Sequence, residues 1–211
     1  MAANGDAADR TAPGRKTAGR AANAMGGQDM KLRGKVALIT GAGRGIGKGI
    51  AECMAREGAR LIIADINGDT AKATAAEMGS AGHEAIAVKA DVTKADQVRA
   101  MVDVAYDRFG GLDVAVNNAG IVRAKPLVDT PEDEWDLVME ANVKSVFLCC
   151  KEQAPRMVKS GGGAIINIAS TAGIQGVAGL SNYCASKYAV VGFTSSIARE
   201  YARENLRINT L

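Results

Sequence analysis

The stretch KVALITGAGRGIG, residues 35–47, decides the fold because it places an apolar strand, a glycine-rich turn and the start of a helix in direct succession. Glycines at the spacing Gly-x-x-x-Gly-x-Gly let the backbone turn sharply and approach a diphosphate, whose charge the free amides at the start of the helix can bind. Tight strand-to-helix turns need glycine in any case, so the turn alone leaves a purely structural role open. Its setting between a strand and a helix favours a dinucleotide site, formed by Gly41, Gly43, Arg44, Gly45, Ile46 and Gly47.

Beyond this stretch, short apolar runs alternate with amphipathic segments along the chain. The runs are nearly continuous in apolar residues, which is typical of parallel strands covered on both faces of a sheet. Strands that alternate with helices predict an α/β fold of three layers, a doubly wound parallel sheet with right-handed crossovers. Ligands of such sheets bind beyond the carboxyl ends of the strands. The predicted strands are residues 35–40, 60–65, 84–89, 112–117, 163–169 and 206–211.

Asp65 ends the second predicted strand, about 20 residues after the glycine turn, where an acid can hydrogen-bond the ribose hydroxyls of an adenosine. The same acid would repel a 2′-phosphate, and Ile66 beside it supplies no cation for one. This favours NAD over NADP, although Arg44 in the glycine turn keeps NADP as a second option. The alternative interpretation of Asp65 is an aspartate that only caps the following helix.

Four further residues follow the third and fourth predicted strands at the same edge of the sheet. Because this edge carries the ligand site, we expect these residues to line its adenine and ribose part. They are Asp91, Val92, Asn118 and Gly120.

The segment after the fifth predicted strand carries a hydroxyl, a phenol and an ammonium group. Ser170 directly follows that strand at its carboxyl end, and Tyr183 and Lys187 lie four residues apart on a predicted helix, so both can face one cleft. A free tyrosine has a pKa of roughly 10, but a cation within about 4–6 Å favours the phenolate. Lys187 could therefore make Tyr183 a general acid or base, and Ser170 could hold a substrate oxygen in line. The same spacing also arises by chance on amphipathic helices.

Asn142 falls within an apolar helical stripe that includes Trp135, and we expect Trp135 and Phe147 to be core residues. An unpartnered buried amide costs roughly 1–3 kcal/mol, so Asn142 should be hydrogen-bonded inside the protein. A bond to a neighbouring backbone group is the structural alternative to a catalytic role.

The composition indicates one globular domain that acts on small molecules. Of the 211 residues 47% are hydrophobic, and 26 Lys and Arg balance 23 Asp and Glu without a basic surface for nucleic acid or anionic membranes. No apolar run approaches the roughly 20 residues that cross a bilayer. The four cysteines lack a metal-ligand spacing, so we expect no metal site, and reduced thiols favour a cytoplasmic location.

Residues 1–30 differ from the rest, because Ala, Gly, Arg and Asp dominate and no hydrophobic period is seen. This predicts a disordered tail, with the globular domain spanning residues 31–211. Four basic residues in the tail leave an organellar transit peptide as an alternative, but Asp6, Asp9 and the lack of serine argue against it.

Taken together, the motifs resemble those of the short-chain dehydrogenase/reductase family, in its form with a single Rossmann domain, over about residues 32–211. The turn from Thr40 to Gly47 matches the family's glycine turn, and residues 117–120 match its Asn-Asn-Ala-Gly element. The family's catalytic tetrad is matched in order by Asn142, Ser170, Tyr183 and Lys187.

This resemblance implies an NAD-dependent oxidoreductase that interconverts a secondary alcohol and a ketone. It implies that Tyr183 is the acid/base, that Ser170 orients the substrate oxygen, and that Lys187 lowers the tyrosine pKa and binds the nicotinamide ribose. Asn142 would support a water in the proton relay. Asp65 and Asn118 would bind the adenosine side of the cofactor, so that Tyr183 and Lys187 count among the cofactor-binding residues as well.

The resemblance also implies a homodimer through two long helices, at about 132–158 and 181–204. A family member would continue beyond Leu211 through a turn over the nicotinamide, a mobile substrate-covering segment and a last strand, so the fold is expected to lack its last strand. This leaves a second interpretation, a non-catalytic dinucleotide-binding paralogue that acts through dimerisation. A related epimerase or dehydratase fits less well, because such enzymes usually need a larger substrate domain.

Overall fold

A computed structural model describes residues 30–211, and the predicted disordered tail lies outside the described residues except for Met30. Six parallel strands form one sheet in the order β3-β2-β1-β4-β5-β6, which confirms the predicted doubly wound α/β fold. The strands are β1 Val36–Thr40, β2 Arg60–Asp65, β3 Ala85–Lys89, β4 Val114–Asn117, β5 Gly163–Asn167 and β6 Leu206–Thr210.

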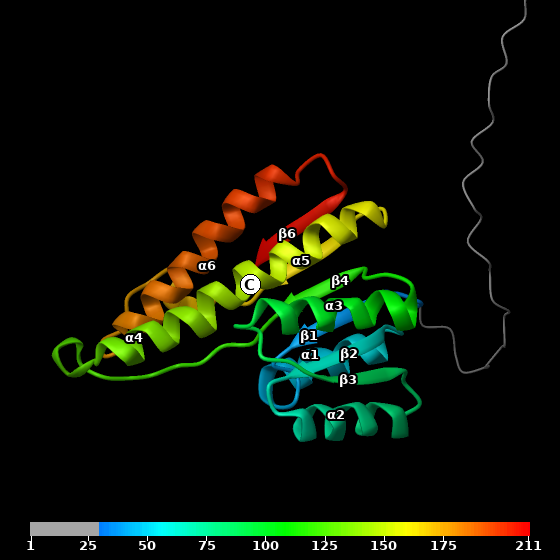
Figure 1. Cartoon of the computed structure of the whole chain (residues 1–211), viewed down its shortest axis with the longest axis horizontal. Coiled ribbons are helices and arrows are strands. Elements are labelled where there is room, and N and C mark those ends of the chain that lie inside the picture. Colours follow the sequence, from blue (N-terminus) through cyan, green and yellow to red (C-terminus); the bar gives the residue numbers. More distant parts are fainter. Residues whose placement is uncertain (1–29) are drawn as a thin grey trace, which may run out of the picture.

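Helices connect successive strands and return the chain to the start of the next one (Figure 1). They are α1 Gly45–Arg56, α2 Gly68–Ser80, α3 Ala95–Phe109, α4 Glu132–Met139, α5 Ser145–Lys159 and α6 Ser181–Glu200. A π-helical segment, η2 Glu140–Lys144, joins α4 to α5, so that the three form one continuous rod (Figure 1). Two single 3-10 turns complete the set, η1 Leu127–Asp129 and η3 Thr171–Gly173.

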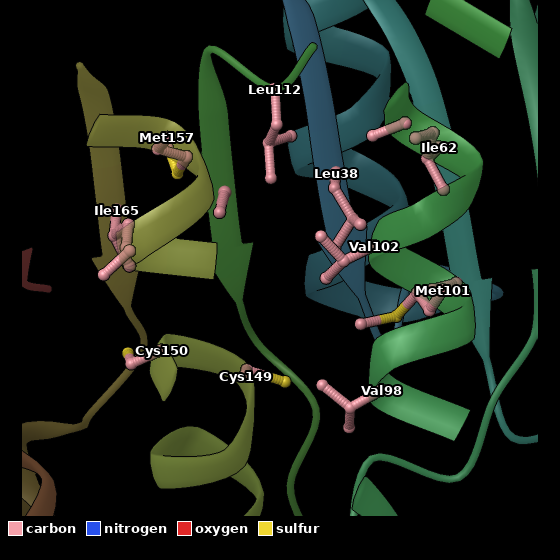
Figure 2. Close-up of a cluster of buried hydrophobic side chains, with 14 of the residues drawn as sticks. Leu38, Ile62, Val98, Met101, Val102, Leu112, Cys149, Cys150, Met157 and Ile165 are labelled. Carbon is pink, nitrogen blue, oxygen red and sulfur yellow. The ribbon is translucent and has the colours of Figure 1, made fainter. Parts of the chain in front are cut away.

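The core consists of one apolar layer on each face of the sheet. On one face, alternate residues of the central strands such as Ile39 and Ile63 pack against Ala51 of α1 and Ala71 of α2. On the other face the sheet meets α3, α5 and α6, as Figure 2 shows for a large part of this cluster. Its labelled members are Leu38, Ile62, Val98, Met101, Val102, Leu112, Cys149, Cys150, Met157 and Ile165.

The winding direction of the sheet reverses between β1 and β4. β1 pairs with β2 on one side and with β4 on the other, so the connections from these two strands leave toward opposite faces. Such a reversal opens a crevice at the carboxyl ends of the strands, which is where doubly wound sheets bind their ligands. The glycine turn after β1 borders this crevice.

β6 departs from the prediction that every strand is covered on both faces. Leu206 and Ile208 are buried in the layer that contains α6, while Arg207 and Asn209 are exposed on the opposite face. The prediction was wrong for this strand because its side chains alternate between apolar and polar residues, and the polar face meets no helix in the described part of the chain.

Trp135 and Phe147 are not core residues, which corrects a second expectation. The exposed fraction is 37% for Trp135 and 43% for Phe147. Phe147 packs edge-on against Phe193 of α6, with ring centroids 6.3 Å apart. Apolar residues at helical spacing occur both in cores and on exposed apolar faces. The spacing alone therefore could not show that Trp135 and Phe147 are exposed.

The two long helices predicted to mediate a dimer are present with changed bounds. The first is the rod of α4, η2 and α5, which ends at Lys159. The second, α6, ends at Glu200 instead of 204, because the chain then turns toward Asn205, whose φ of 52° lies in the left-handed region. The Asn205 side chain donates to the Gly161 carbonyl at 2.7 Å and closes this corner.

Candidate active site

A cavity of about 760 Å³ lies at the carboxyl ends of the strands and brings most of the predicted site residues together. This volume suits a ligand of cofactor size. Gly43 and Asn142 are the two predicted residues that do not line the cavity. Those that do are Gly41, Arg44, Gly45, Ile46, Gly47, Asp65, Asp91, Val92, Asn118, Gly120, Ser170, Tyr183 and Lys187.

The glycine turn is so tight that side chains would not fit in it. A Cβ at Gly47 would collide with the backbone carbonyl of Gly41 and lie 2.6 Å from the Asn118 side chain. Gly41 and Gly45 have φ values of 63° and 59°, in the left-handed region that favours glycine. The turn therefore depends on glycine at three positions.

The start of α1 is suited to an anion. Arg44 occupies the N-cap position without a side-chain cap, and the first turn of α1 contains no acidic residue. The free amides and the positive end of the helix dipole therefore face the cavity without a negative side chain in the helix's own first turn. Both features fit a phosphate group of a bound dinucleotide.

Asp65 braces the glycine turn in addition to bordering the cavity. Its Oδ2 accepts a hydrogen bond from the Gly43 amide at 2.9 Å, and its Oδ1 accepts one from the Asn67 amide at 3.0 Å. Asp65 does not cap α2, because the Asn67 side chain does so by accepting from Asp69 and Thr70. The helix-capping alternative is therefore wrong, and the carboxylate joins the ends of β1 and β2.

Asn118 and Thr40 join the ends of β1 and β4 in a similar way. The Asn118 Nδ2 donates to the carbonyl oxygens of Thr40 and Gly41 at 2.9 and 3.2 Å. The Thr40 hydroxyl accepts the amides of Asn118 and Ala119 at 3.0 and 3.1 Å. Asn118 thus shapes the glycine turn through its side chain, and Thr40 is a positioning residue that the sequence did not reveal.

Asp91 lines the cavity and is held in place by its own loop. Its Oδ1 accepts from the Thr93 amide at 2.9 Å and from the Thr93 hydroxyl at 2.7 Å. Burial would raise the pKa of Asp91, but these bonds and the charges of Lys94 and Lys144 outweigh it, so the pKa is lowered. Asp91 is therefore anionic at neutral pH.

Ser170, Tyr183 and Lys187 meet at the other end of the cavity. The Ser170 hydroxyl accepts the Ala172 amide at 3.2 Å, which fixes its oxygen while leaving its hydrogen to donate to another group. The Lys187 ammonium lies 5.6 Å from the centre of the Tyr183 ring, so the predicted shared face of the helix is present. Lys187 also donates to the Ile168 carbonyl at 2.8 Å, which anchors it to the exit of β5.

Burial lowers the pKa of Lys187 from 10.5 to about 8. In the unfolded chain this lysine keeps its ordinary value, so between pH 8 and 10.5 the unfolded state binds more protons and stability rises with pH. The cost of burying the ammonium is present in full below pH 8 and is lost above the unfolded pKa. We expect the free energy of unfolding to rise by about 3 kcal/mol across this range relative to a Lys187→Met variant.

Urea unfolding of both proteins at a series of pH values measures this difference, because other titrating groups contribute equally to the two curves. An identical pH dependence of the two proteins would show that Lys187 is not desolvated as described.

Asn142 is fully buried, as predicted, and all of its polar atoms have partners. Its Oδ1 accepts the Ile121 amide at 2.8 Å, and its Nδ2 donates to the Ile121 carbonyl at 2.9 Å and to the Ser186 hydroxyl at 3.0 Å. Gly120 leaves room for this amide, since a Cβ there would lie 2.9 Å from the Asn142 oxygen. The π-helical segment η2 places Asn142 between the loop after β4 and α6.

Several residues that line the cavity were not predicted from the sequence. Ile121 and Val122 directly follow the Asn-Asn-Ala-Gly element, so their place at the sheet edge was the signal that could have identified them. Ala141 was hidden by the π-helical turn of η2, which has no sequence pattern of its own. The other unpredicted lining residues are Ile66, Ala90, Thr93, Ala119, Ile168, Ala169 and Leu211.

Three further features of the described residues bear on the class of site. Among residues 30–211 no group of three or more His, Cys, Asp or Glu side chains is placed to hold a metal ion. None of the helices in the same part of the chain is long and apolar enough to cross a membrane. All four cysteines are free thiols.

Comparisons with known proteins agree with the fold and the motifs. Residues 35–211 match a family model described as short chain dehydrogenase. The 3-oxoacyl-[acyl-carrier-protein] reductase FabG of Staphylococcus aureus is 42% identical over 178 residues, which make up 84% of this chain and 72% of that protein. The D-threitol dehydrogenase of Mycolicibacterium smegmatis is 40% identical over 185 residues, covering 87% of this chain and 70% of that protein.

A solved structure shows the same arrangement of elements. The crystal structure of a short-chain type dehydrogenase/reductase from Mycobacterium marinum superposes with a TM-score of 0.82 at 41% sequence identity. The superposition covers 86% of this chain and 75% of that one.

Proposed function

The chain belongs to the short-chain dehydrogenase family, and from this premise we propose that it interconverts a secondary alcohol and a ketone with a nicotinamide dinucleotide. The observation that carries the proposal is that one cavity joins a dinucleotide-type glycine turn to Ser170, Tyr183 and Lys187. A site for proton transfer beside a site for a hydride carrier is what carbonyl reduction needs. Residues 31–211 would form the cofactor-binding domain.

The residues present fit a dinucleotide. Gly45 lines the cavity and has no atom within 4 Å of where its Cβ would stand, so a diphosphate could approach the backbone there, and the uncapped start of α1 would bind its charge. Asp65 and Asp91 would bind the adenosine ribose side, with Ile66 and Val92 flanking the base, and Lys187 would bind the nicotinamide ribose. When bound, the nicotinamide supplies or accepts the hydride.

The chain's own residues would move the proton. The Tyr183 phenol donates a proton to the carbonyl oxygen of the substrate as that oxygen gains negative charge, and in the reverse reaction the phenolate removes it. The Lys187 ammonium stabilises the phenolate from across the ring, and the Ser170 hydroxyl donates to the same substrate oxygen. Asn142 itself does not line the cavity, but its neighbour Ala141 in η2 does. The predicted support of a relay water by Asn142 would therefore depend on how Asn142 positions η2 beside the cavity.

We propose that the preferred cofactor is NAD. The Asp65 carboxylate borders the cavity next to Ile66, and a 2′-phosphate at this place would meet its negative charge. Arg44 also lines the cavity and is the cation that could favour NADP instead.

The unchanged chain is expected to reduce a ketone with NADH at a kcat/KM at least about ten-fold above that with NADPH. Nicotinamide absorbance with ethyl acetoacetate, and with D-threitol in the oxidative direction, measures this preference. These probes represent the two substrate types in the names of the relatives. A preference for NADPH would show that Arg44, and not Asp65, determines which cofactor is preferred. Turnover with neither cofactor would count against the proposed reaction.

We also propose that the chain forms homodimers through the rod and α6. The support is the exposed apolar face on these elements, which includes Trp135, Phe147 and Tyr188. Groups of this kind are enriched at interfaces between subunits.

The free thiols agree with the proposed cytoplasmic location.

A further inference from the structure

Ser186 is a fully buried hydroxyl in the helix that carries the proposed acid/base. It lies on α6 between Tyr183 and Lys187, its exposed fraction is 0%, and it does not line the cavity. It therefore cannot contact a substrate or cofactor bound there. Any part that it plays in the reaction must pass through another residue.

The bonds of this hydroxyl connect Asn142 to the turn of α6 that bears the catalytic pair. Its oxygen accepts a hydrogen bond from Asn142 Nδ2 at 3.0 Å, and its hydrogen is donated to the Tyr183 carbonyl at 2.7 Å. In an α-helix the same carbonyl accepts the backbone amide of Lys187. The Ser186 hydroxyl is thus hydrogen-bonded to the carbonyl group whose helical bond sets the distance between Tyr183 and Lys187 along the helix.

Asn142 extends this connection to the sheet edge. It is bonded to both backbone groups of Ile121, in the loop after β4 that lines the cavity. The turn is held a second time where the Lys187 ammonium meets the Ile168 carbonyl at the exit of β5. The segment from Tyr183 to Lys187 is therefore fixed to two separate strand ends.

Thr194 repeats the same arrangement two turns further along α6. Its hydroxyl accepts from Asn167 Nδ2 at 3.0 Å and donates to the Val190 carbonyl at 2.7 Å. It is also buried, with 2% of its surface exposed, but it lies away from the cavity. Thr194 supplies a matched control, because it has the same chemistry in the same helix without contact to the catalytic turn.

We propose that Ser186 is a positioning residue for proton transfer, which holds the turn between Tyr183 and Lys187 against Asn142. The proposal rests on the proposed function, since it assigns the proton transfer to that turn. A purely structural hydroxyl would contribute to stability alone, as we expect for Thr194.

Ser186→Ala deletes a hydroxyl and Thr194→Val replaces one with a methyl group. Each leaves one buried amide hydrogen without its acceptor, so both should lower the urea midpoint of unfolding. Only Ser186→Ala is expected to reduce kcat, by about ten-fold, with KM for ethyl acetoacetate and NADH kept within about twofold. Its pH–rate profile should also shift, because this profile reports the ionisation of the groups that take part in the proton transfer.

A double-mutant cycle with Asn142→Ala tests whether Ser186 acts through its hydrogen bond with Asn142. If Ser186 acts through Asn142, the double variant loses no more kcat than Asn142→Ala alone, whereas Thr194→Val adds nothing to either. Should Ser186→Ala fail to fold, Ser186→Cys retains the shape with only a weak donor and gives the same comparison.

Equal kcat values and pH profiles for Ser186→Ala and Thr194→Val would overturn this inference while leaving the proposed function intact. Turnover that survives Tyr183→Phe would instead overturn the proposed function and this inference with it, so the two failures are distinct.

Discussion

Replacing Gly47 with alanine is expected to weaken NADH binding by about ten-fold to a hundred-fold. The added Cβ would collide with the backbone carbonyl of Gly41, and backbone cannot move aside as a flexible side chain can. The turn must therefore open, which displaces the amides that would bind the diphosphate and disrupts the bonds from Asn118 to Thr40 and Gly41. Calorimetric titration with NADH measures the loss.

Gly49→Ala is the matched control for this substitution. Gly49 lies in the same helix two residues later, and a Cβ there would meet no atom within 4 Å. Alanine favours a helix over glycine by about 1 kcal/mol, so this variant should bind NADH normally and unfold at a higher urea concentration. A folded Gly47→Ala protein with unchanged NADH affinity would contradict the assignment of the glycine turn to the cofactor.

The fold could be predicted because its information is local. Each buried strand is an apolar run, each run is bounded by a turn, and the alternation with helices leaves little choice of topology. β6 shows the limit of predicting burial from an apolar run. Arg207 and Asn209 alternate with apolar residues in this strand and indicate an exposed face that was overlooked. The exposure of Trp135 and Phe147 could not be predicted, since an apolar side chain does not reveal whether its own chain covers it.

The site could be predicted wherever helical or strand geometry sets the neighbours. Tyr183 and Lys187 share a face because they lie four residues apart, and Asp65 borders the glycine turn because their strands are adjacent. The residues that support them were not evident. Thr40 and Ser186 act through bonds to distant segments, and such bonds depend on the packed structure.

Asn142 illustrates both cases. Its burial within an apolar stripe predicted hydrogen-bonded partners, and the partners are present. That the partners are Ile121 and Ser186 follows from the π-helical turn of η2, which adds a residue to the helical repeat without a sequence signal. The three bonds place Asn142 as the link between the loop after β4 and the helix of the acid/base.

Replacing Tyr183 with phenylalanine is expected to reduce kcat by about a hundred-fold to ten-thousand-fold. The substitution removes the only atom that would exchange a proton with the substrate oxygen, and it leaves the ring that packs beside Lys187. Binding of NADH should change less than about fivefold, because the glycine turn and Asp65 are untouched. Tyr188→Phe is the matched control, since this exposed tyrosine lies on the same helix outside the cavity and should retain full activity.

The most direct measurement uses NADH that carries deuterium at its hydride position. It detects the deuterium at the carbinol carbon of the alcohol formed from ethyl acetoacetate. The unchanged chain and Tyr183→Phe are compared at a concentration of NADH that saturates both. We predict that the unchanged chain and Tyr188→Phe transfer the label, while Tyr183→Phe binds NADH and transfers it at no more than about a hundredth of that rate. Equal transfer by Tyr183→Phe would contradict the central claim that Tyr183 moves the proton in a nicotinamide-dependent carbonyl reduction.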